Sequence, residues 1–202
     1  HWVSCLLTYS SRLKEETRCR VVEDEIETLH VHSYHSFAKW TTKQEGYDDL
    51  MLMEAIKHTF NPACRMDLLI LDEQQDQTWL YWKLVSRIIS EFQPKRLLVL
   101  GDARQCVFAF AGADSRFLTL ISEIVDFPMQ NLRLTTSFRM THQIAFFVNR
   151  VMLNRRDGCD DSIVTVRDGP PVTICTCNIF SWGSEFLKYF TDQIRIYGPG
   201  NT

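Results

Sequence analysis

The sequence lacks several features that would assign a protein directly to a class. None of its apolar runs approaches the roughly 20 residues that span a bilayer, and its start has no signal-peptide pattern, so we expect no membrane partner. The formal net charge is only -3, so contact with nucleic acid would need a local groove rather than bulk attraction. None of the eight glycines is followed by lysine, and no stretch has the form GxxxxGK(S/T). Nothing identified in these residues would cradle β- and γ-phosphates, so autonomous hydrolysis of a nucleoside triphosphate is not expected.

The seven cysteines are odd in number and scattered, mostly within apolar runs. This usage favours reduced thiols in an intracellular protein, in the nucleus if the source is eukaryotic and otherwise in the cytoplasm. Cys175 and Cys177 lie two apart in an expected strand and would face one side. Because no second cysteine or histidine pair stands at metal spacing, we expect no zinc site.

Apolar strands alternate with amphipathic helices along the chain, which predicts an α/β fold with a doubly wound parallel sheet. Within the strand expected at residues 67–71, positions 68–71 are apolar in succession, as in a central strand covered by helices on both faces. We expect strands at residues 2–9, 30–35, 67–71, 97–100, 132–134 and 172–177, and helices at residues 13–22, 50–59, 80–92, 115–125, 141–153 and 185–194.

A change of composition marks a boundary in the second half of the chain. Residues 154–171 are rich in Arg, Asp, Gly and Pro, and a new strand and helix are expected beyond them. We therefore predict a first domain at residues 1–153, a linker at 154–171 and the beginning of a second domain at 172–202.

Two adjacent carboxylates, Asp72 and Glu73, follow the most apolar expected strand. Ligands bind at the carboxyl ends of strands in open α/β sheets. An acidic pair there suits nucleotide hydrolysis, in which one carboxylate orders Mg²⁺ and the next activates water. The alternative is an acidic helix start, which the helix dipole favours.

A second apolar strand, at residues 97–100, also runs into polar residues. Gly101 would allow a tight turn, Asp102 supplies a third carboxylate, and Gln105 would sense a phosphate or the attacking water. Two parallel strands that present acid and amide groups at one sheet edge describe a site. The alternative for Gln105 is a solvated loop amide.

Five motifs in order resemble those of UvrD/Rep-type superfamily 1A DNA helicases. Residues 72–76, DEQQD, resemble motif II, and residues 101–113, GDARQCVFAFAGA, resemble motif III. Residues 132–139, LRLTTSFR, resemble motif IV, residues 7–18 are similar to motif Ia, and residues 35–37 match the HSF that follows it. The resemblance implies a RecA-like P-loop NTPase domain, a parallel sheet flanked by helices, incomplete here and followed by the start of a second RecA-like domain.

The same resemblance implies roles for the nucleotide site, with ATP and Mg²⁺ as cofactors of the complete motor. Asp72 would hold Mg²⁺, and Glu73 would be the general base for attack of water on the γ-phosphate. Gln75 would help bind the nucleotide, and together with Gln105 it would couple that site to DNA. Arg139 would contact the γ-phosphate and stabilise charge in the transition state.

Aromatic residues are implied in binding the base of the nucleotide and single-stranded DNA or DNA junctions. Phe138 takes the place of the tyrosine that stacks on adenine in the family. Phe108 and Phe110 take aromatic places in motif III, where bases stack. The alternative for this pair is core packing on a half-buried strand. Three further residues are expected to line the same channel, with a structural role as the alternative: Tyr9, His35 and Phe37.

The chain also departs from the family pattern. Ala111 stands where motif III usually has arginine, and Ser137 stands where motif IV has asparagine. The resemblance places the phosphate-binding loop before residue 1, and motifs V and VI after residue 202. We therefore expect part of an ATP-dependent helicase motor that does not hydrolyse ATP alone. The alternative is a degenerate helicase-derived module that binds nucleic acid or protein without ATPase activity.

Overall fold

The computed structural model describes residues 3–42, 48–58, 60, 66–155, 162–174 and 183–198. The chain divides into two compact units, His1–Gln130 and Asn131–Thr202, and each is described by itself. Within the described residues, no helix combines the length and the apolar character needed to cross a membrane.

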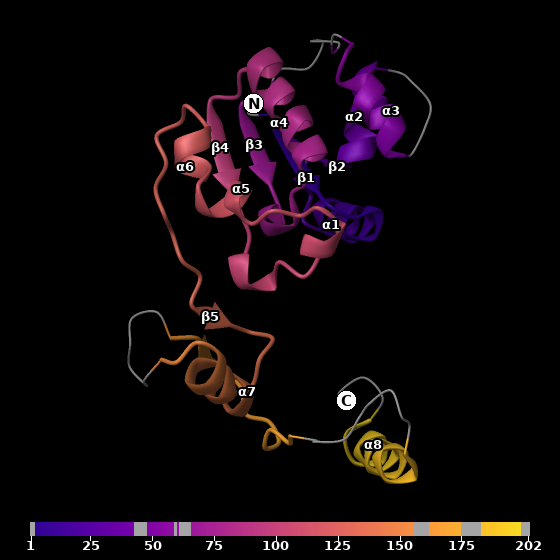
Figure 1. Cartoon of the computed structure of the whole chain (residues 1–202), viewed down its shortest axis with the longest axis vertical. Helices are drawn as coiled ribbons and strands as arrows, with labels where there is room; N and C mark the ends of the chain where they lie inside the picture. The colour runs from indigo at the N-terminus through magenta and orange to yellow at the C-terminus, as the bar shows by residue number, and fades with distance from the viewer. Residues whose placement is uncertain are drawn as a thin grey trace. The chain divides into compact units, whose positions relative to one another are not determined.

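The first unit is built on a four-stranded parallel sheet in the order β2-β1-β3-β4 (Figure 1). Its strands are β1 (Ser4–Thr8), β2 (Leu29–Ser33), β3 (Leu68–Leu71) and β4 (Arg96–Val99). Strand β1 pairs with β2 on one side and with β3 on the other, and β3 pairs with β4. Helices connect successive strands, so the expected α/β fold with a parallel sheet flanked by helices is confirmed.

Side-chain caps start the main helices of this unit. Ser10 accepts a hydrogen bond from the N–H of Leu13, and Thr78 caps its helix through the N–H of Tyr81. The expected helix at residues 115–125 is split because the backbone of Leu120 leaves the helical region. The helices are α1 (Ser11–Glu23), α2 (Tyr34–Thr42), α3 (Asp49–Ala55), α4 (Trp79–Phe92), α5 (Arg116–Thr119) and α6 (Ile121–Ile124), with 3₁₀ turns η1 (Gln74–Asp76), η2 (Ala103–Gln105) and η3 (Ala109–Ala111).

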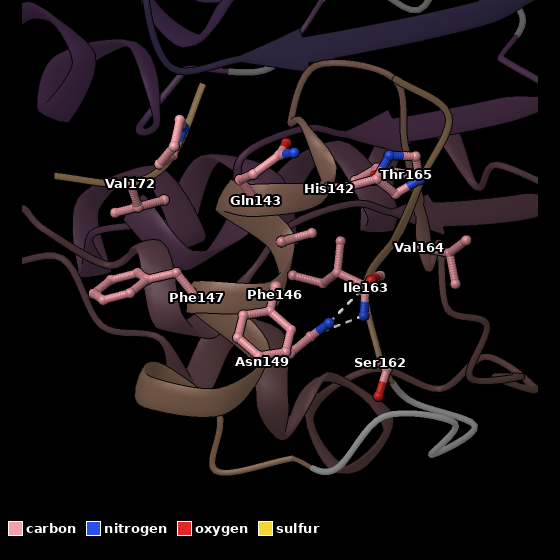
Figure 2. A pocket seen from close by; sticks show the side chains of 12 residues that line it. His142, Gln143, Phe146, Phe147, Asn149, Ser162, Ile163, Val164, Thr165 and Val172 are labelled. Atoms are coloured by element: carbon pink, nitrogen blue, oxygen red, sulfur yellow. Dashed lines mark hydrogen bonds between the residues drawn. The ribbon is translucent and has the colours of Figure 1, made fainter. Parts of the chain in front are cut away.

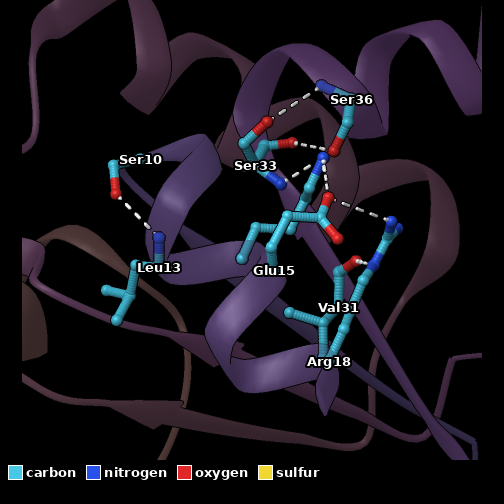
Figure 3. Close-up of polar contacts among 8 residues, drawn as sticks. Ser10, Leu13, Glu15, Arg18, Val31, Ser33 and Ser36 are labelled. Atoms are coloured by element: carbon cyan, nitrogen blue, oxygen red, sulfur yellow. Dashed lines mark hydrogen bonds and ion pairs between the residues drawn. The ribbon is translucent and has the colours of Figure 1, made fainter.

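Strand β2 passes into α2 without a loop, held by two serines (Figure 3). The N–H of Ser33 donates to Oγ of Ser36 at 2.8 Å, and the N–H of Ser36 donates back to Oγ of Ser33 at 3.3 Å. The Arg18 side chain ties α1 to this strand by donating to the carbonyl of Val31 at 2.9 Å. The strand expected to reach residue 35 therefore ends at Ser33, because the serine pair starts a helix there.

The hydrophobic core lies on one face of the sheet. Leu7, Leu69 and Leu71 are 0% exposed, and they pack with apolar residues of α2, α3 and α4. Their neighbours along β1 and β3, such as Leu6 and Ile70, are only half-buried. Helix α1 contributes no buried residue to cover them. The prediction that residues 67–71 are covered on both faces is therefore met on one face only.

Strand β4 differs from its expected interior position. Its residues alternate between exposed and half-buried, and Leu98 is 41% exposed. Among the described strands, β4 pairs only with β3, which makes it the edge of this sheet. An apolar sequence in an edge strand leaves one row of backbone groups without a neighbouring strand in the described part of the chain.

The second unit contains a short parallel pair, β5 (Thr136–Ser137) and β6 (Val164–Thr165). Helix α7 (His142–Phe147) continues into a π-helical turn, Val148–Met152, and α8 (Ser184–Tyr197) follows later. The expected strand at residues 132–134 does not form, and Leu132 and Leu134 are strongly exposed.

The boundary between the units falls after Gln130 rather than at residue 153. The Asn149 side chain explains this difference, because its amide exchanges two hydrogen bonds with the backbone of Ile163. The helix expected to close the first domain thus packs with the segment that was expected to be a linker. Residues 172–174 are not in a strand, and the rest of the strand expected at residues 172–177, with Cys175 and Cys177, lies outside the described residues.

Candidate nucleotide and nucleic-acid site

Polar residues follow the carboxyl ends of the parallel strands at one edge of the sheet. Thr8 ends β1, Asp72 follows β3, and Gly101 follows β4. The N–H of Asp72 donates to the carbonyl of Leu7 at 2.9 Å, so the β1–β3 pairing extends to the first carboxylate. Because this edge is the usual ligand-binding edge of a parallel sheet, the fold brings the predicted acidic and amide groups together.

Asp72 is half-buried, and its Oδ1 accepts a hydrogen bond from the N–H of Glu73 at 3.0 Å. Burial raises the pKa of Asp72, and the negative charge of the adjacent Glu73 raises it further. A cation bound here would relieve that repulsion. Mg²⁺ takes one or two protein carboxylates together with water and phosphate oxygens, so this pair fits it, although the described residues contain no group of three metal-binding side chains.

Glu73 has a left-handed backbone, with φ 51° and ψ 44°. This conformation is uncommon for a residue with a side chain and costs about 1 kcal/mol or more. The residues that follow form only a single 3₁₀ turn, and helix α4 begins later, at Trp79. The alternative of an acidic helix start is therefore not what the structure has.

Gln75 joins the two predicted catalytic loops. Its Nε2 donates to Oε2 of Glu73 at 2.6 Å, and its Oε1 accepts from the N–H of Asp102 at 3.1 Å. Gln75 is 2% exposed, so its amide is held on the buried side of both contacts. Gly101 makes room for it, because a Cβ at Gly101 would lie 2.6 Å from Oε1 of Gln75.

Gln105 is exposed, and its amide donates to Oδ2 of Asp102 at 3.0 Å. The other carboxylate oxygen of Asp102 accepts from the N–H of Arg104 and starts the turn η2. Gln105 is therefore bound within its own loop, which is close to the solvated-amide alternative.

Backbone contacts hold the two loops together beyond Gln75. The N–H of Gln74 donates to the carbonyl of Leu100 at 3.0 Å, and the carbonyl of Gln77 accepts from the N–H of Asp114 at 2.9 Å. An isolated antiparallel bridge joins Thr78 to Ala113. The loop that carries Glu73 and the loop that carries the exposed aromatics thus form one connected structure.

The aromatics of the second loop lie beside Tyr9. The rings of Tyr9 and Phe108 are stacked, with centroids 5.8 Å apart, and Phe108 is 6.2 Å from Phe110. Phe110 is 87% exposed and Phe108 is 37% exposed. Both belong to or precede the 3₁₀ turn η3, so the alternative of a half-buried strand is wrong for this pair. Three rings at a surface offer a stacking platform for unpaired bases.

His35 is half-buried, and its Nε2 lies 3.2 Å from Oδ1 of Asp49. It also meets the ring of Tyr81 edge-on. Phe37 requires a correction, because its side chain is 0% exposed and packs against Phe60 and Phe92 in the core. A fully buried ring cannot line a DNA channel, so that prediction for Phe37 is wrong.

Several polar groups at this edge were not singled out from the sequence. Buried side-chain atoms of Thr8, Gln74, Asp76 and Gln77 have no hydrogen-bond partner in the part of the chain that the structure describes. Burial raises the pKa of Asp76, as does the charge of Glu73. The sequence motifs could have pointed to these four residues, because all of them lie within or beside the quoted motifs. Buried polar atoms without partners are uncommon and often mark a ligand or water position.

A protein-family model described as an AAA domain matches residues 5–111, more than half of the 202-residue chain. The chain belongs to this AAA domain family. ATP-dependent DNA helicase UvrD2 of Mycobacterium tuberculosis strain ATCC 25618 / H37Rv is 32% identical over 117 residues, as is UvrD2 of Mycobacterium bovis. ATP-dependent DNA helicase Rep of Salmonella typhimurium is 29% identical over 115 residues. These matches confirm the resemblance to UvrD/Rep-type helicases.

Each match covers 54% of the chain and 16% of the relative. The AAA domain match contains every candidate residue of the first unit, from Tyr9 to Phe110, and ends before Phe138 and Arg139. The motif IV residues therefore lie outside the part of the chain that the AAA domain model matches.

In the second unit, Phe138 is 74% exposed and Arg139 is also exposed. Oγ of Ser137 accepts from the N–H of Met140 at 3.1 Å, which shapes the turn that carries them. The carbonyl of Arg139 accepts a hydrogen bond from the guanidinium of Arg167.

The second unit also contains an apolar cavity of about 750 Å³ (Figure 2). Helix α7 and strand β6 line it, with Phe146, Phe147 and Val164 among its apolar side chains. One polar residue of its lining, Asn149, hydrogen-bonds to the backbone of Ile163, as Figure 2 shows. None of the residues predicted from the sequence to bind nucleotide or DNA lines this cavity.

Proposed function

We propose that this chain is part of an ATP-dependent DNA helicase motor, in which hydrolysis of ATP is coupled to movement along single-stranded DNA. The observation that carries the proposal is the Gln75 side chain, which binds both Glu73 and the backbone of Asp102. One buried amide thereby connects a candidate general base to the loop of the exposed rings. The names of UvrD2 and Rep, both ATP-dependent DNA helicases, support the same function.

Glu73 would accept the proton of the water that attacks the γ-phosphate. Its left-handed backbone and its hydrogen bond from Gln75 hold the carboxylate in one orientation, so little reorganisation is needed when water binds. Asp72 would hold Mg²⁺, which when bound would neutralise negative charge on the phosphates.

The second unit would supply two further groups for binding the nucleotide. Arg139 would contact the γ-phosphate as charge develops, and Phe138 would stack on adenine. Both side chains are exposed, so neither is committed to a core in the described part of the chain. Gln105 would respond to the nucleotide through its hydrogen bond to Asp102.

Single-stranded DNA or a DNA junction would bind where Tyr9, Phe108 and Phe110 gather. Base stacking on such rings is worth about 1–3 kcal/mol per base and tolerates any sequence. His35 would lie at the side of this platform, through its contact with Tyr81.

A second candidate is a helicase-derived module that binds nucleic acid or protein without hydrolysing ATP. The observation that favours it is the absence of a GxxxxGK(S/T) stretch from the 202 residues. For both candidates we propose a location inside the cell. The relatives are bacterial, so they give no support to a location in the nucleus.

Two measurements test these candidates, and the second separates them. The 202-residue chain should bind a fluorescein-labelled oligodeoxythymidylate, measured by anisotropy at low salt, and Phe108→Ala should weaken binding about tenfold or more, from the loss of 1–3 kcal/mol of stacking. In a longer protein that joins this chain to a phosphate-binding loop, single-stranded DNA should stimulate ATP turnover, and Glu73→Gln should abolish it while ATP binding remains. ATP binding without DNA stimulation would favour the second candidate.

A further inference from the structure

Tyr81 on helix α4 stands at the centre of a group of aromatic rings. Its ring is stacked on that of Tyr34, with centroids 4.8 Å apart and planes within 3°. It meets Tyr9 edge-on at 5.8 Å, and Tyr9 in turn stacks on Phe108. Ring contacts therefore run without a break from the exposed platform to Tyr34, which is buried in the core.

The chain of rings ends at Tyr34, which hydrogen-bonds to Gln77 in the loop that follows Glu73. The hydroxyl of Tyr34 donates to Oε1 of Gln77 at 2.7 Å, and both side chains are about 1% exposed. Nε2 of Gln77 has no hydrogen-bond partner among the described residues. The hydroxyl of Tyr34 is thus the group that orients the Gln77 amide.

The backbone of Gln77 contacts both the loop that carries Glu73 and the loop that carries Phe108. Its N–H donates to the carbonyl of Gln74 at 3.3 Å and closes the turn that follows Glu73. Its carbonyl accepts from Asp114, just beyond the loop of Phe108. A change in the position of Gln77 would therefore reach the loop that carries the candidate base.

The hydroxyl end of the Tyr81 side chain is also held in place. Its hydroxyl lies 3.4 Å from Oδ1 of Asp49, the carboxylate that also contacts His35. With the hydroxyl held there and the ring packed against Tyr34, the ring has little room to turn independently. In a close-packed cluster, a displaced ring shifts its neighbours instead of filling empty space.

We propose that Tyr81 and Tyr34 are positioning residues that couple stacking of an unpaired base on Tyr9 and Phe108 to the orientation of Gln77. The inference rests on the proposed function, because it needs single-stranded nucleic acid at that platform. Base stacking reorients Tyr9, Tyr9 reorients Tyr81, and the stacked Tyr34 carries the change to Gln77.

The test uses the ¹⁵N-labelled 202-residue chain and an oligodeoxythymidylate, with binding followed by anisotropy and the Gln77 side-chain amide by NMR. At saturating DNA, the Gln77 amide resonances should shift in the wild type and in Tyr81→Phe, which keeps the ring. In Tyr81→Leu the shift should be lost, while affinity falls by less than about tenfold because the platform itself remains.

Trp79→Leu is the matched control. Trp79 lies on the same helix and stacks on Phe117 outside the ring chain, so its loss should leave the Gln77 shift intact. Tyr34→Phe removes one hydroxyl and should also abolish the shift; it decides the question if Tyr81→Leu does not fold.

The outcomes separate the two proposals. A Gln77 shift that persists in Tyr81→Leu or in Tyr34→Phe, with DNA still bound, would overturn the coupling and leave the proposed function standing. Failure of the wild-type chain to bind the oligonucleotide would overturn DNA binding by this chain, and the coupling with it.

Discussion

The two compact units hold their candidate residues in different ways. In the first, Glu73 and Asp102 are joined through a buried glutamine that is hydrogen-bonded at both ends of its amide. In the second, Phe138 and Arg139 are exposed on a turn shaped by Ser137. Preorganised polar groups lower the reorganisation needed for chemistry, so the first unit carries the part of the site that is built before any ligand binds.

The two units also differ in how well their apolar residues are buried. Among the described residues, every member of the hydrophobic core cluster belongs to the first unit. In the second, large apolar residues such as Val151, Met152 and Ile174 are at least 64% exposed. Burial of apolar surface is the dominant stabilising contribution to folding. Substitutions at equivalent residue types should therefore have unequal effects in the two units.

The largest effect is expected from Phe37→Ala. Removal of a fully buried ring leaves a cavity, which typically costs about 3–5 kcal/mol of unfolding free energy. Phe146→Ala is the comparison in the second unit, where the ring is 55% exposed and the cost should be about 1 kcal/mol or less. Urea denaturation followed by circular dichroism measures both. Equal losses would show that the difference in packing between the units does not exist.

Two glycines allow a comparison of close contacts. A Cβ at Gly101 would meet Gln75 and, at 3.2 Å, the backbone nitrogen of Gln74; one at Gly169 would meet Cγ2 of Thr141 at 2.4 Å. Alanine at either position should cost up to about 3 kcal/mol, because the contacted groups are held in place. Hydrogen exchange followed by mass spectrometry should locate the Gly101→Ala effect in the first unit and the Gly169→Ala effect in the second. Effects that appear in both units would mean that the units unfold together.

The pH dependence of stability should also come from the first unit. Burial lowers the pKa of His32 to about 4, and the charges of Arg18, His30 and Lys14 act in the same direction. Between pH 6.5 and pH 4 the unfolded chain binds a proton at His32 that the folded chain does not. Stability should therefore fall by about 2 kcal/mol from pH 7 to pH 5.

The control for this pH effect keeps an aromatic ring at residue 32 and removes the imidazole that titrates. His32→Phe preserves stacking on Trp40 and should flatten the pH profile of the unfolding midpoint. A steep profile in His32→Phe would contradict the assignment.

The sequence predicted the first unit better than the second for a physical reason. The strands there are apolar runs that pass directly into polar residues, so the position of those residues at the sheet edge follows from strand direction. Burial was harder, since Phe37 and Phe110 are the same residue type, yet one is 0% and the other 87% exposed. Phe37 belongs to the buried face of α2, with Tyr34, Ala38 and Thr41 at helical spacing, whereas Phe110 lies in the short 3₁₀ turn η3.

The second unit was predicted less well because its contacts join residues distant in the sequence. The short pair β5–β6 and the Asn149–Ile163 hydrogen bonds decide where the boundary falls. Two-residue strands carry almost no periodicity, so pattern cannot find them. The role proposed for Tyr81 has no signature in the sequence either, since a single aromatic residue on an amphipathic helix usually indicates core packing.

The smallest effect on stability is expected at the two motif IV residues. Phe138→Ala and Arg139→Gln should each change the unfolding free energy by no more than about 0.5 kcal/mol, because both side chains are exposed. Thermal unfolding of the 202-residue chain measures this. In the longer protein with a phosphate-binding loop, Arg139→Gln should lower ATP turnover about a thousandfold or more if the guanidinium stabilises transition-state charge. A large loss of turnover with unchanged stability would separate function from folding at this residue. Normal turnover in Arg139→Gln would remove the second unit from the catalytic site and leave the chemistry to the first.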